Sequence, residues 1–584
     1  MKNKKTIGLI SLLMLSIQGC ISGSENPVYS NHEVRQMKYI NPMFGENVFI
    51  FDPKMEMKEI QTLIDSLYSQ QHPRTSEFSL RRYALFFKPG VYQLDLKIGY
   101  YMQILGLGGS PDDVVIQGTL ISKGEKNGNV TCNFWRSVEN ISIVPPPGAK
   151  NIWGVSQASP MRRVHIKGDI QLHDDGWASG GYLADSKIDG TIFAGGQQQW
   201  FTRNTDPGKW DGGSWNMVFV GVPNAPADQW PHNPYTVIDK TPLIREKPYL
   251  VLDGSDYRIK IPKLRYNRTG VSWINPKHDE DVLNIGDFYI VKPDVDHSET
   301  INAALKEGKN LLFSPGVYKL DKSLQISRPG TLVIGIGMPS LESDNGNSVL
   351  NISDIDGVTV CGLTIDAGKI PSGSLFNVGE PNSTQSHAKN PTFLFDLFFR
   401  VGGYGEGKTE SCLVINSGNV VVDHTWLWRA DHGKNVGWDQ NTSRNGLVVN
   451  GNSVTVYALF CEHFQEYQTL WNGNEGKVFF YQSEMPYDPP TVGSWKHDNV
   501  GGYASYKVAD KVKKHEAWGL GIYCVFYKAP VLVDNCIETP LALEKEIHHK
   551  ITFWLNGNKE SVMKSIINGK GGQVDVSNKK AIME

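Results

Sequence analysis

Residues 87–95 read FKPGVYQLD, and residues 313–321 read FSPGVYKLD. The second segment follows the first by 226 positions, and the agreement extends further, because LGLG at 105–108 has the counterpart IGIG at 334–337. A nine-residue match with shared flanking sequence indicates an internal repeat. A chain of 584 residues is also too long for one ordinary core. The sequence therefore predicts two homologous domains.

A helical segment precedes each copy of the repeat. In the first, Asp52 and Pro53 offer a cap and a first-turn proline, and the apolar residues within 57–67 recur at helical spacing. In the second, Ser298 is the candidate cap and Gly308 the candidate stop. We expect each helix to cover the open end of its domain and so protect the edge of the first coil.

Short strands dominate the rest of both halves. Alternating runs of three to five residues are separated by Gly, Asn and Asp. Examples are MRRVHIKG (161–168), YLADSKIDGTIF (182–193), VLNISDIDGVTVCGLTIDAG (349–368), CLVINSGNVVVDHTWLW (412–428) and GLVVNGNSVTVYALFCEHF (446–464). This pattern is typical of a solenoid whose coils contain a few strands joined by tight turns. We predict an all-β chain with two tandem right-handed parallel β-helices. A β-sandwich, the alternative, would have longer strands and more hairpin turns.

The first residues are typical of a targeting segment. Three lysines within the first five residues precede the apolar run TIGLISLLMLSI, and the segment ends at Cys20. The run is too short for a spanning helix and fits a signal peptide. The ending IQGC resembles a bacterial lipobox, which implies cleavage before Cys20 and lipid attachment to its thiol. An ordinary signal peptide with a chance cysteine is the alternative.

These features together predict the layout of the chain. We expect a signal peptide over 1–19, a lipid-anchor tether over 20–40, a first β-helix over 41–275, a second β-helix over 276–545 and a C-terminal strand extension over 546–584. The expected location is the cell envelope, with the protein lipid-anchored at the outer membrane, in the periplasm or at the surface. No later segment is apolar for long enough to cross a bilayer.

Composition excludes several functions. The formal net charge is −3, and the sequence has no basic cluster of the kind that binds a nucleic-acid backbone. Besides Cys20, six cysteines are scattered without a CxxC pair or zinc spacing. They are Cys132, Cys361, Cys412, Cys461, Cys524 and Cys536. Most have β-branched or aromatic neighbours, which predicts buried, unreactive thiols. We expect neither a metal nor a cofactor.

Polar residues gather without a folding reason at 461–490 in the second half. Glu462 and Glu484 are 22 residues apart, which is about one solenoid coil, and aromatic residues are interleaved with them. Residues one coil apart stack side by side, so the two carboxylates are expected to share a pocket. Neighbouring carboxylates repel in their charged forms, which raises one pKa and keeps a proton for general acid catalysis.

A second polar stretch covers 151–216 in the first half. Gln157 and Ser179 are again 22 residues apart, and the run 197–204 is rich in amides and aromatic rings. Amides hydrogen-bond to sugar hydroxyls, and rings stack on the apolar faces of pyranoses. A stacked structural ladder is the alternative for the glutamines of this run. The candidate substrate-binding residues are Gln198, Trp200, Arg203, Trp215, His463, Trp471 and Tyr487.

The double FxPGxY repeat, the two-helix layout and the segment from Glu462 to QSEMPY resemble glycoside hydrolase family 55. Members of that family are inverting, exo-acting β-1,3-glucanases with tandem β-helices in one chain. The resemblance covers residues 41–545. Met485 and Asp488 depart from the family pattern, which indicates a divergent branch whose substrate can differ.

The resemblance implies a role for each of four residues. Glu484, in the Q-x-E-x-P-Y segment, matches the general acid, and Glu462, in the E-H pair, matches a glutamate across the site. Gln157 and Ser179 match the glutamine and serine that hold the attacking water. The implied reaction is hydrolysis of a polysaccharide, a β-1,3-glucan above all, with inversion at the anomeric carbon.

One other cluster supports a different chemistry. Asp423, His424, Arg429, Asp431 and His432 are close together in the sequence. Polysaccharide lyases with β-helices use a Lys or Arg base, often with calcium held by carboxylates. A lyase acting on uronate polymers is therefore an alternative, although a buried Asp–His–Arg network explains the cluster better. A non-catalytic carbohydrate-binding or adhesion solenoid is a third possibility, against which the paired carboxylates argue.

Overall fold

The computed structural model describes residues 38–274 and 279–584. The expected signal peptide, Cys20 and nearly all of the tether lie outside the described residues. Within the described part, the chain is almost entirely strand and turn, with α-helices only at α2 (Met57–Gln71) and α3 (Ser298–Lys306). Neither of these helices has the length and apolarity needed to span a membrane. Short 3-10 turns are η1 (Arg74–Ser76), η2 (Pro111–Asp113), η3 (Ile285–Asp287) and η4 (Leu541–Glu546).

The first half forms one 17-stranded sheet of parallel pairs. Its strands are β1 (Val48–Phe51), β2 (Tyr83–Phe87), β3 (Gly90–Tyr92), β4 (Leu96–Lys97), β5 (Met102–Gly106), β6 (Val114–Gln117), β7 (Leu120–Ser122), β8 (Arg136–Val144), β9 (Asn151–Trp153), β10 (Pro160–Ile166), β11 (Ile170–Gln171), β12 (Tyr182–Ala184), β13 (Lys187–Phe193), β14 (Gln199–Arg203), β15 (Asp206–Asp211), β16 (Asn216–Val220) and β17 (Tyr235–Ile238). One face runs β2, β5, β8, β10, β12, β14, β16. Each strand thus pairs with its equivalent one coil later, as in a β-helix.

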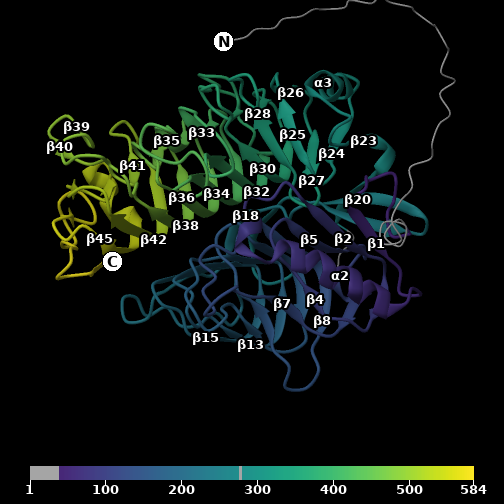
Figure 1. Ribbon diagram of the computed structural model, residues 1–584. Coiled ribbons are helices and arrows are strands. Elements are labelled where there is room, and N and C mark those ends of the chain that lie inside the picture. The colour runs from purple at the N-terminus through teal and green to yellow at the C-terminus, as the bar shows by residue number, and fades with distance from the viewer. Residues whose placement is uncertain (1–37, 275–278) are drawn as a thin grey trace, which may run out of the picture. The chain divides into compact units, whose positions relative to one another are not determined.

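The second half is a second β-helix with two long faces. A 13-stranded sheet contains β23 (Phe288–Val291), β24 (Asn310–Phe313), β25 (Val317–Leu320), β27 (Leu332–Gly335), β28 (Ser340–Ser343), β30 (Thr359–Asp366), β32 (Thr392–Val401), β34 (Val420–Arg429), β36 (Thr455–Glu462), β38 (Gly476–Glu484), β42 (His515–Phe526), β45 (Ile547–Gly557) and β47 (Lys580–Met583). An eight-stranded sheet contains β26 (Leu324–Ile326), β29 (Leu350–Ile352), β31 (Phe376–Val378), β33 (Ser411–Ile415), β35 (Asn445–Val449), β37 (Thr469–Trp471), β41 (Tyr506–Val508) and β44 (Ile537–Glu538). Figure 1 follows this succession from β24 to β45. The prediction of tandem parallel β-helices is confirmed.

An antiparallel segment separates the two β-helices. The last parallel strand of the first ends at residue 238, and the first strand of the second begins at 288. Between them lie β18 (Thr241–Ile244), β19 (Tyr249–Asp253), β20 (Asp256–Pro262), β21 (Arg265–Arg268) and β22 (Glu280–Asn284), which pair antiparallel. The expected boundary at 275 lies outside the described residues, while the described strands on either side of it pair antiparallel and belong to neither coil stack.

The C-terminal segment 546–584 continues the second β-helix before it ends. Strand β45 pairs parallel with β42 and so adds one more coil. Strand β47 then pairs antiparallel with β45. Strand β46 (Val562–Met563) pairs with β43 (Leu532–Val533) of the preceding coil. A separate short pair, β39 (Lys496–His497) with β40 (Val500–Gly501), lies earlier, after β38. The expected strand extension is thus one coil followed by a reversed last strand.

The repeated PGVY segment follows the second strand of each β-helix, and in both copies its tyrosine contacts the end of the first strand. The Tyr92 hydroxyl donates to the carbonyls of Phe51 and Lys88 at 3.0 and 2.9 Å. The Tyr318 hydroxyl donates to the carbonyls of Val291 and Ser314 at 2.9 and 2.8 Å. Each tyrosine therefore ties the strand before the helix to the turn after it. This shared geometry explains why the motif occurs twice.

The glycine of each repeat makes room for a proline. A Cβ on Gly90 would lie 2.6 Å from Cγ of Pro53, and a Cβ on Gly316 would lie 2.6 Å from Cβ of Pro293. Each proline follows the strand that precedes the helix, which is β1 or β23. Both PG turns thus pack on the start of the connection between the first two strands of their β-helix.

The change Gly316→Ala tests this packing. We expect it to lower the free energy of unfolding by about 1–3 kcal/mol, because an added methyl group in a close-packed contact forces the backbone to move. Gly373 is the matched control, since a Cβ there would meet no described atom within 4 Å, and Gly373→Ala should be close to neutral. Urea unfolding of both variants measures the difference, and equal stabilities would contradict the steric explanation.

The two helices do not begin where the sequence suggested: α2 begins later, and α3 begins one residue earlier, at its predicted cap. α2 begins at Met57 behind Glu56, while the carboxylate of Asp52 instead accepts a hydrogen bond from the Lys54 amide in the preceding turn. α3 begins at Ser298 itself, behind His297. The Ser298 hydroxyl is used elsewhere, as an acceptor from a backbone amide of the next coil.

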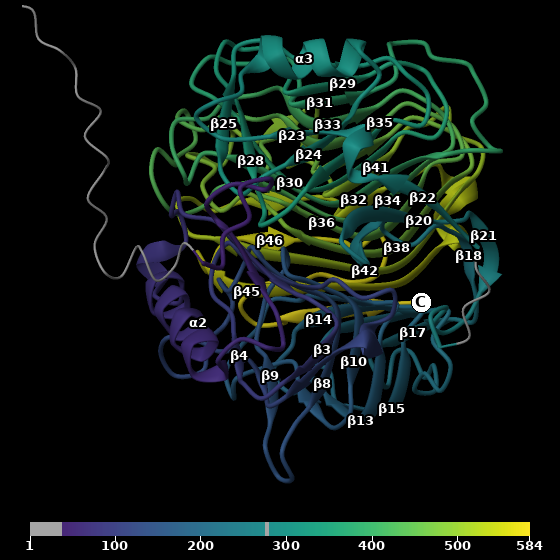
Figure 2. The ribbon, with the colours of Figure 1, turned by 90° about the vertical axis from the view of Figure 1, so that its right-hand side faces the viewer.

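Each helix follows an edge strand and buries its apolar face in the core. These strands, β1 and β23, were not predicted from the sequence; they precede the helices and pair parallel with the strands that follow. In Figure 1, α3 lies at the end of the second β-helix beside β23 to β26, and Figure 2 shows the coils stacked behind it. The apolar faces of both helices belong to the interior cores, as expected for caps.

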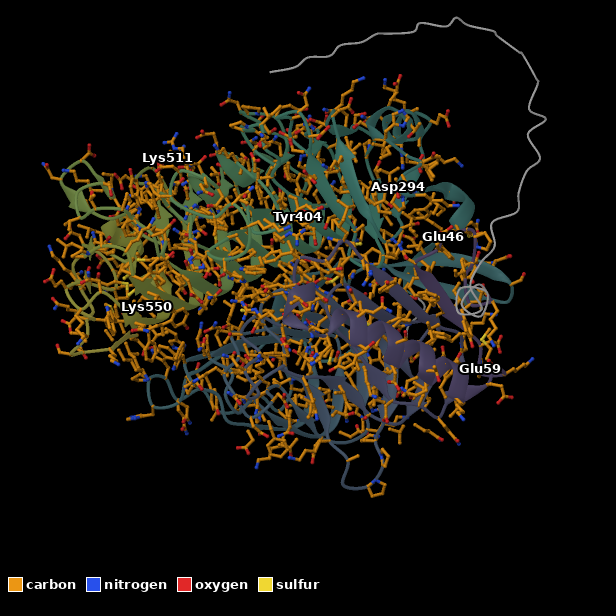
Figure 3. All side chains as sticks on the ribbon, viewed as in Figure 1. Glu46, Glu59, Asp294, Tyr404, Lys511 and Lys550 are labelled. Carbon is orange, nitrogen blue, oxygen red and sulfur yellow. The ribbon has the colours of Figure 1, made fainter. Side chains whose placement is uncertain are left out.

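Three apolar cores stabilise the molecule. One fills the interior of each β-helix. The third combines outward-facing residues of both, among them Phe201 and Val218 of the first with Phe460 and Phe480 of the second. Buried charges accompany it: the Arg400 guanidinium contacts Tyr101 of the first β-helix and lies over the ring of Tyr404, which Figure 3 labels. The two β-helices therefore share one close-packed interface.

Candidate active site

One hydrogen bond brings the two predicted polar stretches together. The Gln157 amide nitrogen donates to Oε1 of Glu462 at 2.9 Å, and both side chains are buried. Gln157 lies in the loop before β10 of the first β-helix, and Glu462 ends β36 of the second. An amide of one β-helix therefore contacts a carboxylate of the other, although 305 residues separate them in the sequence.

Alternation along neighbouring strands aims the acidic pair at the interface. On β36, Cys461 points into the interior core, while Phe460 belongs to the core between the β-helices. Side chains alternate along a strand, so Glu462 follows Phe460 onto the interface face. The backbone amide of His463 donates to the carbonyl oxygen of Glu484 at 2.8 Å. Glu462 and Glu484 therefore lie on adjacent coils, as the 22-residue spacing predicted.

Two nitrogen donors hold Glu462. The indole nitrogen of Trp426 donates to Oε2 at 2.8 Å, opposite the Gln157 amide on Oε1. Burial raises the pKa of Glu462, while His463 and the hydrogen bonds from Trp426 and Gln157 oppose that rise. Donors to both oxygens favour the ionised form. Glu462 is the more ionisable member of the pair.

Glu484 has the opposite character. Burial raises its pKa well above the usual range, and the negative charges of Glu462 and Asp431 add to that rise. The Tyr487 hydroxyl forms a short hydrogen bond with Oε2. Tyr523 pairs with Glu484 in register on the next strand. Two carboxylates with unequal environments are the arrangement that separates an acid from a base.

Hydrogen bonds to their backbone carbonyls position Gln157 and Ser179, so these contacts do not occupy their side chains. A ring nitrogen of His424 contacts the Gln157 carbonyl oxygen at 2.9 Å, and the Gln199 amide donates to the Ser179 carbonyl at 2.6 Å. Oε1 of Gln157 is buried without a hydrogen-bond partner among the described residues. A buried amide oxygen of this kind is suited to a water or substrate hydroxyl.

Several aromatic rings pack together around Tyr523, which is the strand neighbour of Glu484. Trp215 is half-buried and stacks on Phe553 at 4.4 Å between ring centroids, with Tyr523 at 5.2 Å. Trp177 lies 6.5 Å from Trp215 and is 56% exposed. Of these rings, the sequence singled out only Trp215. Tyr523 and Phe553 occupy neighbouring strands, so only the register reveals that they join Trp215.

Three residues predicted to bind substrate are buried elsewhere, which corrects the prediction. Trp200 lies in the interior core of the first β-helix and Trp471 in that of the second. Arg203 is fully buried and forms ion pairs with Asp185 and Asp423. The alternation of strand β14 accounts for Trp200, which points inward between the outward-facing residues Gln199 and Phe201. None of the three is available to a substrate.

Of the remaining predicted residues, Tyr487 and His463 lie beside the acidic pair. Tyr487 is half-buried on Glu484, and its ring lies 4.3 Å from that of His463. His463 is buried, with Nδ1 3.2 Å from the Met485 carbonyl, so it supports the loop rather than lining a surface. Gln198 is half-buried and joins its strand through its backbone. The side chain of neighbouring Gln197 forms hydrogen bonds with three backbone groups. Gln197 therefore has the structural role that was the alternative for the glutamines of this run.

Residues 423–429 of this cluster form a buried network rather than a lyase site, and only Asp431 and His432 are partly exposed. Asp423 pairs with Arg162 and Arg203 of the first β-helix, and His424 contacts Asp396. These side chains are buried and already paired, so they offer no solvent-facing base. The Asp–His–Arg network that the sequence favoured for this stretch is present.

The two departures beside the proposed acid have structural reasons. Met485 is fully buried in the interior core of the second β-helix. Asp488 accepts two hydrogen bonds from the Arg429 guanidinium at 2.9 and 3.0 Å, and Arg429 also donates to the His463 carbonyl. A charged residue at 488 therefore anchors the turn that follows Glu484 without facing the aromatic rings.

Trp426 and Asp431 are site residues that sequence reasoning missed. Both lie in the stretch that was considered for lyase chemistry, and neither has a motif of its own. Trp426 pairs in register with Phe460, two residues before Glu462. The 22-residue interval could not have placed this stretch beside the acidic pair, because the preceding coil is longer and brings Trp428 into register with Glu462 across 34 residues.

The chain is similar to known proteins over most of its length. The family model of the LAM55 pectate lyase-like domain matches residues 288–484. An exo-β-1,3-glucanase from Streptomyces sp. (strain SirexAA-E / ActE) is 44% identical over 518 residues, which cover 88% of this chain and 85% of that protein. The structure of sacteLam55A from Streptomyces sp. SirexAA-E superimposes with a TM-score of 0.89 at 41% identity, over 92% of this chain and 98% of that one. A single-residue variant of sacteLam55A in complex with glucose matches equally well, with a TM-score of 0.89.

Proposed function

This chain belongs to glycoside hydrolase family 55, and we propose that it cleaves β-1,3-glucans with Glu484 as the general acid. That it is a glycoside hydrolase follows from a relative that is 44% identical over most of both chains. That relative is named an exo-β-1,3-glucanase, which supports the substrate and an exo mode of attack. The contact between Gln157 and Glu462 across the two β-helices carries the assignment of the site.

Glu484 protonates the glycosidic oxygen of the leaving sugar. Its raised pKa keeps it protonated where an ordinary glutamate is ionised, as a general acid requires. Glu462 takes the opposite role, because the donors on both of its oxygens favour the carboxylate. The pair thus divides the work of an inverting glycosidase between one acid and one base.

A water attacks the anomeric carbon from the side of Glu462. Gln157 donates to Glu462, and its own Oε1 is the free acceptor that orients one hydrogen of that water. Ser179, one coil later, supplies a hydroxyl beside it. Glu462 removes the proton as the water attacks, and Glu484 delivers a proton to the departing oxygen. The product therefore has the inverted configuration.

Aromatic side chains bind the sugar rings. Tyr487 contacts Glu484 directly, Trp215 of the first β-helix packs on Tyr523, the strand neighbour of Glu484, and exposed Trp177 lies next to Trp215. Rings of this kind stack on the apolar faces of pyranoses. Tyr523 and Phe553 pack behind Trp215 and fix its orientation.

A product screen tests the function. We expect the protein to release glucose from laminarin. We expect it to cleave neither α-glucans nor polyuronates, and no mixed-linkage glucan whose chain end lacks a 1,3 bond. Proton NMR of the first-formed sugar from a β-1,3-glucan should show the α-anomer, because water attacks from the opposite face. A β-anomer would rule out the proposed water attack, and activity on polyuronate alone would rule out the substrate.

The change Gln157→Ala tests the water-holding role. It removes a donor to a charged group and the acceptor for water, which we expect to lower kcat by about 10- to 150-fold, equivalent to about 1.5–3 kcal/mol. KM should change little, because the lost contacts act in the transition state. Gln70→Ala is the control and should retain wild-type kinetics, because the Gln70 amide donates within helix α2 to the Ser66 carbonyl. An unchanged kcat for Gln157→Ala would remove this residue from the mechanism.

Export and lipid anchoring are part of the proposal. The basic and apolar N-terminus and the IQGC segment support cleavage before Cys20 and acylation of its thiol. The anchor would hold the enzyme in the cell envelope, where polymeric glucan is accessible. Mass spectrometry of the mature N-terminus decides this, since an unmodified Cys20 excludes the anchor while leaving the catalytic assignment untouched.

A further inference from the structure

A group of three unlike side chains meets between the two β-helices, outside the acidic pair. Glu77 follows η1, Cys132 precedes β8 and His432 follows β34. One carboxylate oxygen, the thiol sulfur and one ring nitrogen from these residues all lie within 4.8 Å of one another. Two of the three residues come from the first β-helix and one from the second. Within the described part of the chain, this is the group whose spacing fits a metal ion.

Each side chain of the group is positioned by its surroundings. Nε2 of His432 lies 2.7 Å from Oε1 of Glu77, and Nδ1 lies 2.8 Å from Oδ1 of Asp431. Arg74 pairs with the other oxygen of Glu77 at 3.1 Å. The carbonyl of Glu77 accepts from the Tyr101 hydroxyl at 2.7 Å, which fixes the backbone. The carboxylate of Glu77 and the ring of His432 are thus held in place, and the Cys132 backbone is held by the Tyr100 hydroxyl, which donates to its carbonyl at 2.8 Å.

The contact between His432 and Asp431 is the support that metal-bound imidazoles usually have. A carboxylate on Nδ1 fixes the tautomer and leaves Nε2 as the ligand atom. Nε2 is the nitrogen of His432 that faces Glu77. Trp428 packs on the ring at 5.1 Å between centroids and restricts its rotation.

The chain itself offers a comparison. His387 also lies between two carboxylates, with Asp356 at 2.7 Å and Asp354 at 2.9 Å. Among the described residues, no cysteine lies close enough to His387 and its two carboxylates to form a group with metal-binding spacing. A protonated imidazole between two acids therefore explains His387 completely. At His432 the same arrangement has a thiol added, and an ion pair alone does not account for that thiol.

We propose that Glu77, Cys132 and His432 bind a divalent transition-metal ion, Zn²⁺ above all, that links the two β-helices. Thiolate, imidazole and carboxylate are the ligand types that Zn²⁺ combines in proteins, and three protein ligands leave a fourth position for water. On binding, the Cys132 thiol and Nε2 of His432 each release one proton to solvent. The metal then takes the place of the proton between His432 and Glu77, and no oxidation state changes.

The position suggests a structural clip. His432 follows Asp431, whose charge acts on Glu484, so the metal would fix one wall of the acidic pair to the first β-helix. A ligand that binds only the folded form stabilises it by mass action. The expected effect is a higher thermal midpoint in the metal-loaded protein. Catalysis itself needs no step at this ion.

Metal binding to the untagged chain tests the proposal. After treatment with EDTA and its removal, calorimetric titration with Zn²⁺ should show one site per chain. Co²⁺ in the same site should give the near-ultraviolet absorption of a thiolate–cobalt bond. Cys132→Ser and His432→Asn should each weaken Zn²⁺ binding at least about tenfold, and Cys132→Ser should abolish the cobalt absorption. His387→Asn is the matched control and should leave both signals unchanged.

Two outcomes would overturn the proposal. A wild-type chain that binds no Zn²⁺ at micromolar concentration would show that His432 is an ion-paired imidazolium like His387. Cobalt absorption that survives in Cys132→Ser would show that the metal is bound elsewhere. Because the readout is metal binding and not glucan cleavage, neither result bears on the assignment of Glu484. Circular dichroism of each variant confirms that it is folded.

Discussion

Glu484→Gln is expected to lower kcat on laminarin by about 10²- to 10⁴-fold while leaving the thermal midpoint close to that of the wild type. The amide cannot donate a proton to the glycosidic oxygen, yet it fills the same volume beside Tyr487. Steady-state kinetics on laminarin and a thermal melt measure the two quantities. A variant with near wild-type kcat would remove Glu484 from the role of acid.

A substrate with a better leaving group separates the two glutamates. A dinitrophenyl glucoside needs no protonation of its departing oxygen, so Glu484→Gln should recover most of its lost rate on that substrate. Glu462→Gln should remain slow on both substrates, because water still needs a base. Glu466→Gln, a surface change at the ion pair with Arg444, is the control and should behave as the wild type. Equal rescue of both variants would contradict the division of roles.

The pH profile gives an independent view of Glu484. Activity requires this carboxyl to be protonated, so the alkaline limb of kcat/KM reports its ionisation. Burial and the charges of Glu462 and Asp431 raise the pKa, which places that limb above the range of an exposed glutamate. Glu484→Gln should lose this limb, because no proton remains to titrate.

Much of the fold and half of the site followed from spacing alone. The repeated PGVY segment identified two β-helices because a tyrosine, a glycine and a proline recreate the same contacts in each. The 22-residue interval placed Glu462 beside Glu484, since one coil returns the chain to the same face. The same interval paired Gln157 with Ser179. Periodicity carries this information because each coil contacts mainly its neighbours.

Contacts between the two β-helices could not be predicted in this way. Trp200 and Trp215 look alike in the sequence, but Trp200 lies in an interior core while Trp215 contacts Tyr523 of the second β-helix. Arg203 looked like a sugar ligand because its partner Asp423 lies 220 residues away. Which faces meet is set by packing of whole surfaces and not by any local motif.

The interface should depend most strongly on Asp423. Its carboxylate accepts from the Tyr182 hydroxyl at 2.7 Å and from the guanidinium groups of Arg162 and Arg203 at 3.0 and 2.9 Å. All of these side chains are buried. The arginines hold the pKa of Asp423 below its usual range in spite of the burial. A single anion thus compensates charges from two strands of the first β-helix.

Asp423→Asn is expected to cost about 3–5 kcal/mol of the free energy of unfolding, because it breaks two buried ion pairs at once and leaves Arg162 and Arg203 with one carboxylate partner each, Asp396 and Asp185. Chemical unfolding with wild-type and variant protein measures this loss. Asp65→Asn removes an exposed ion pair with Lys97 and should cost less than about 1 kcal/mol. Comparable losses for the two variants would show that the buried network contributes no more to the free energy of unfolding than an exposed ion pair does.

The same change should also affect catalysis without touching the substrate. Asp423 and Asp396 share Arg162, and Asp396 positions His424, whose other ring nitrogen contacts the Gln157 carbonyl. Movement of this chain of contacts displaces the Gln157 amide from Glu462. We therefore expect kcat of Asp423→Asn to fall even where the protein is fully folded, with KM nearly unchanged. A folded variant with normal kcat would show that the network stabilises the interface without setting the geometry of the water-holding side.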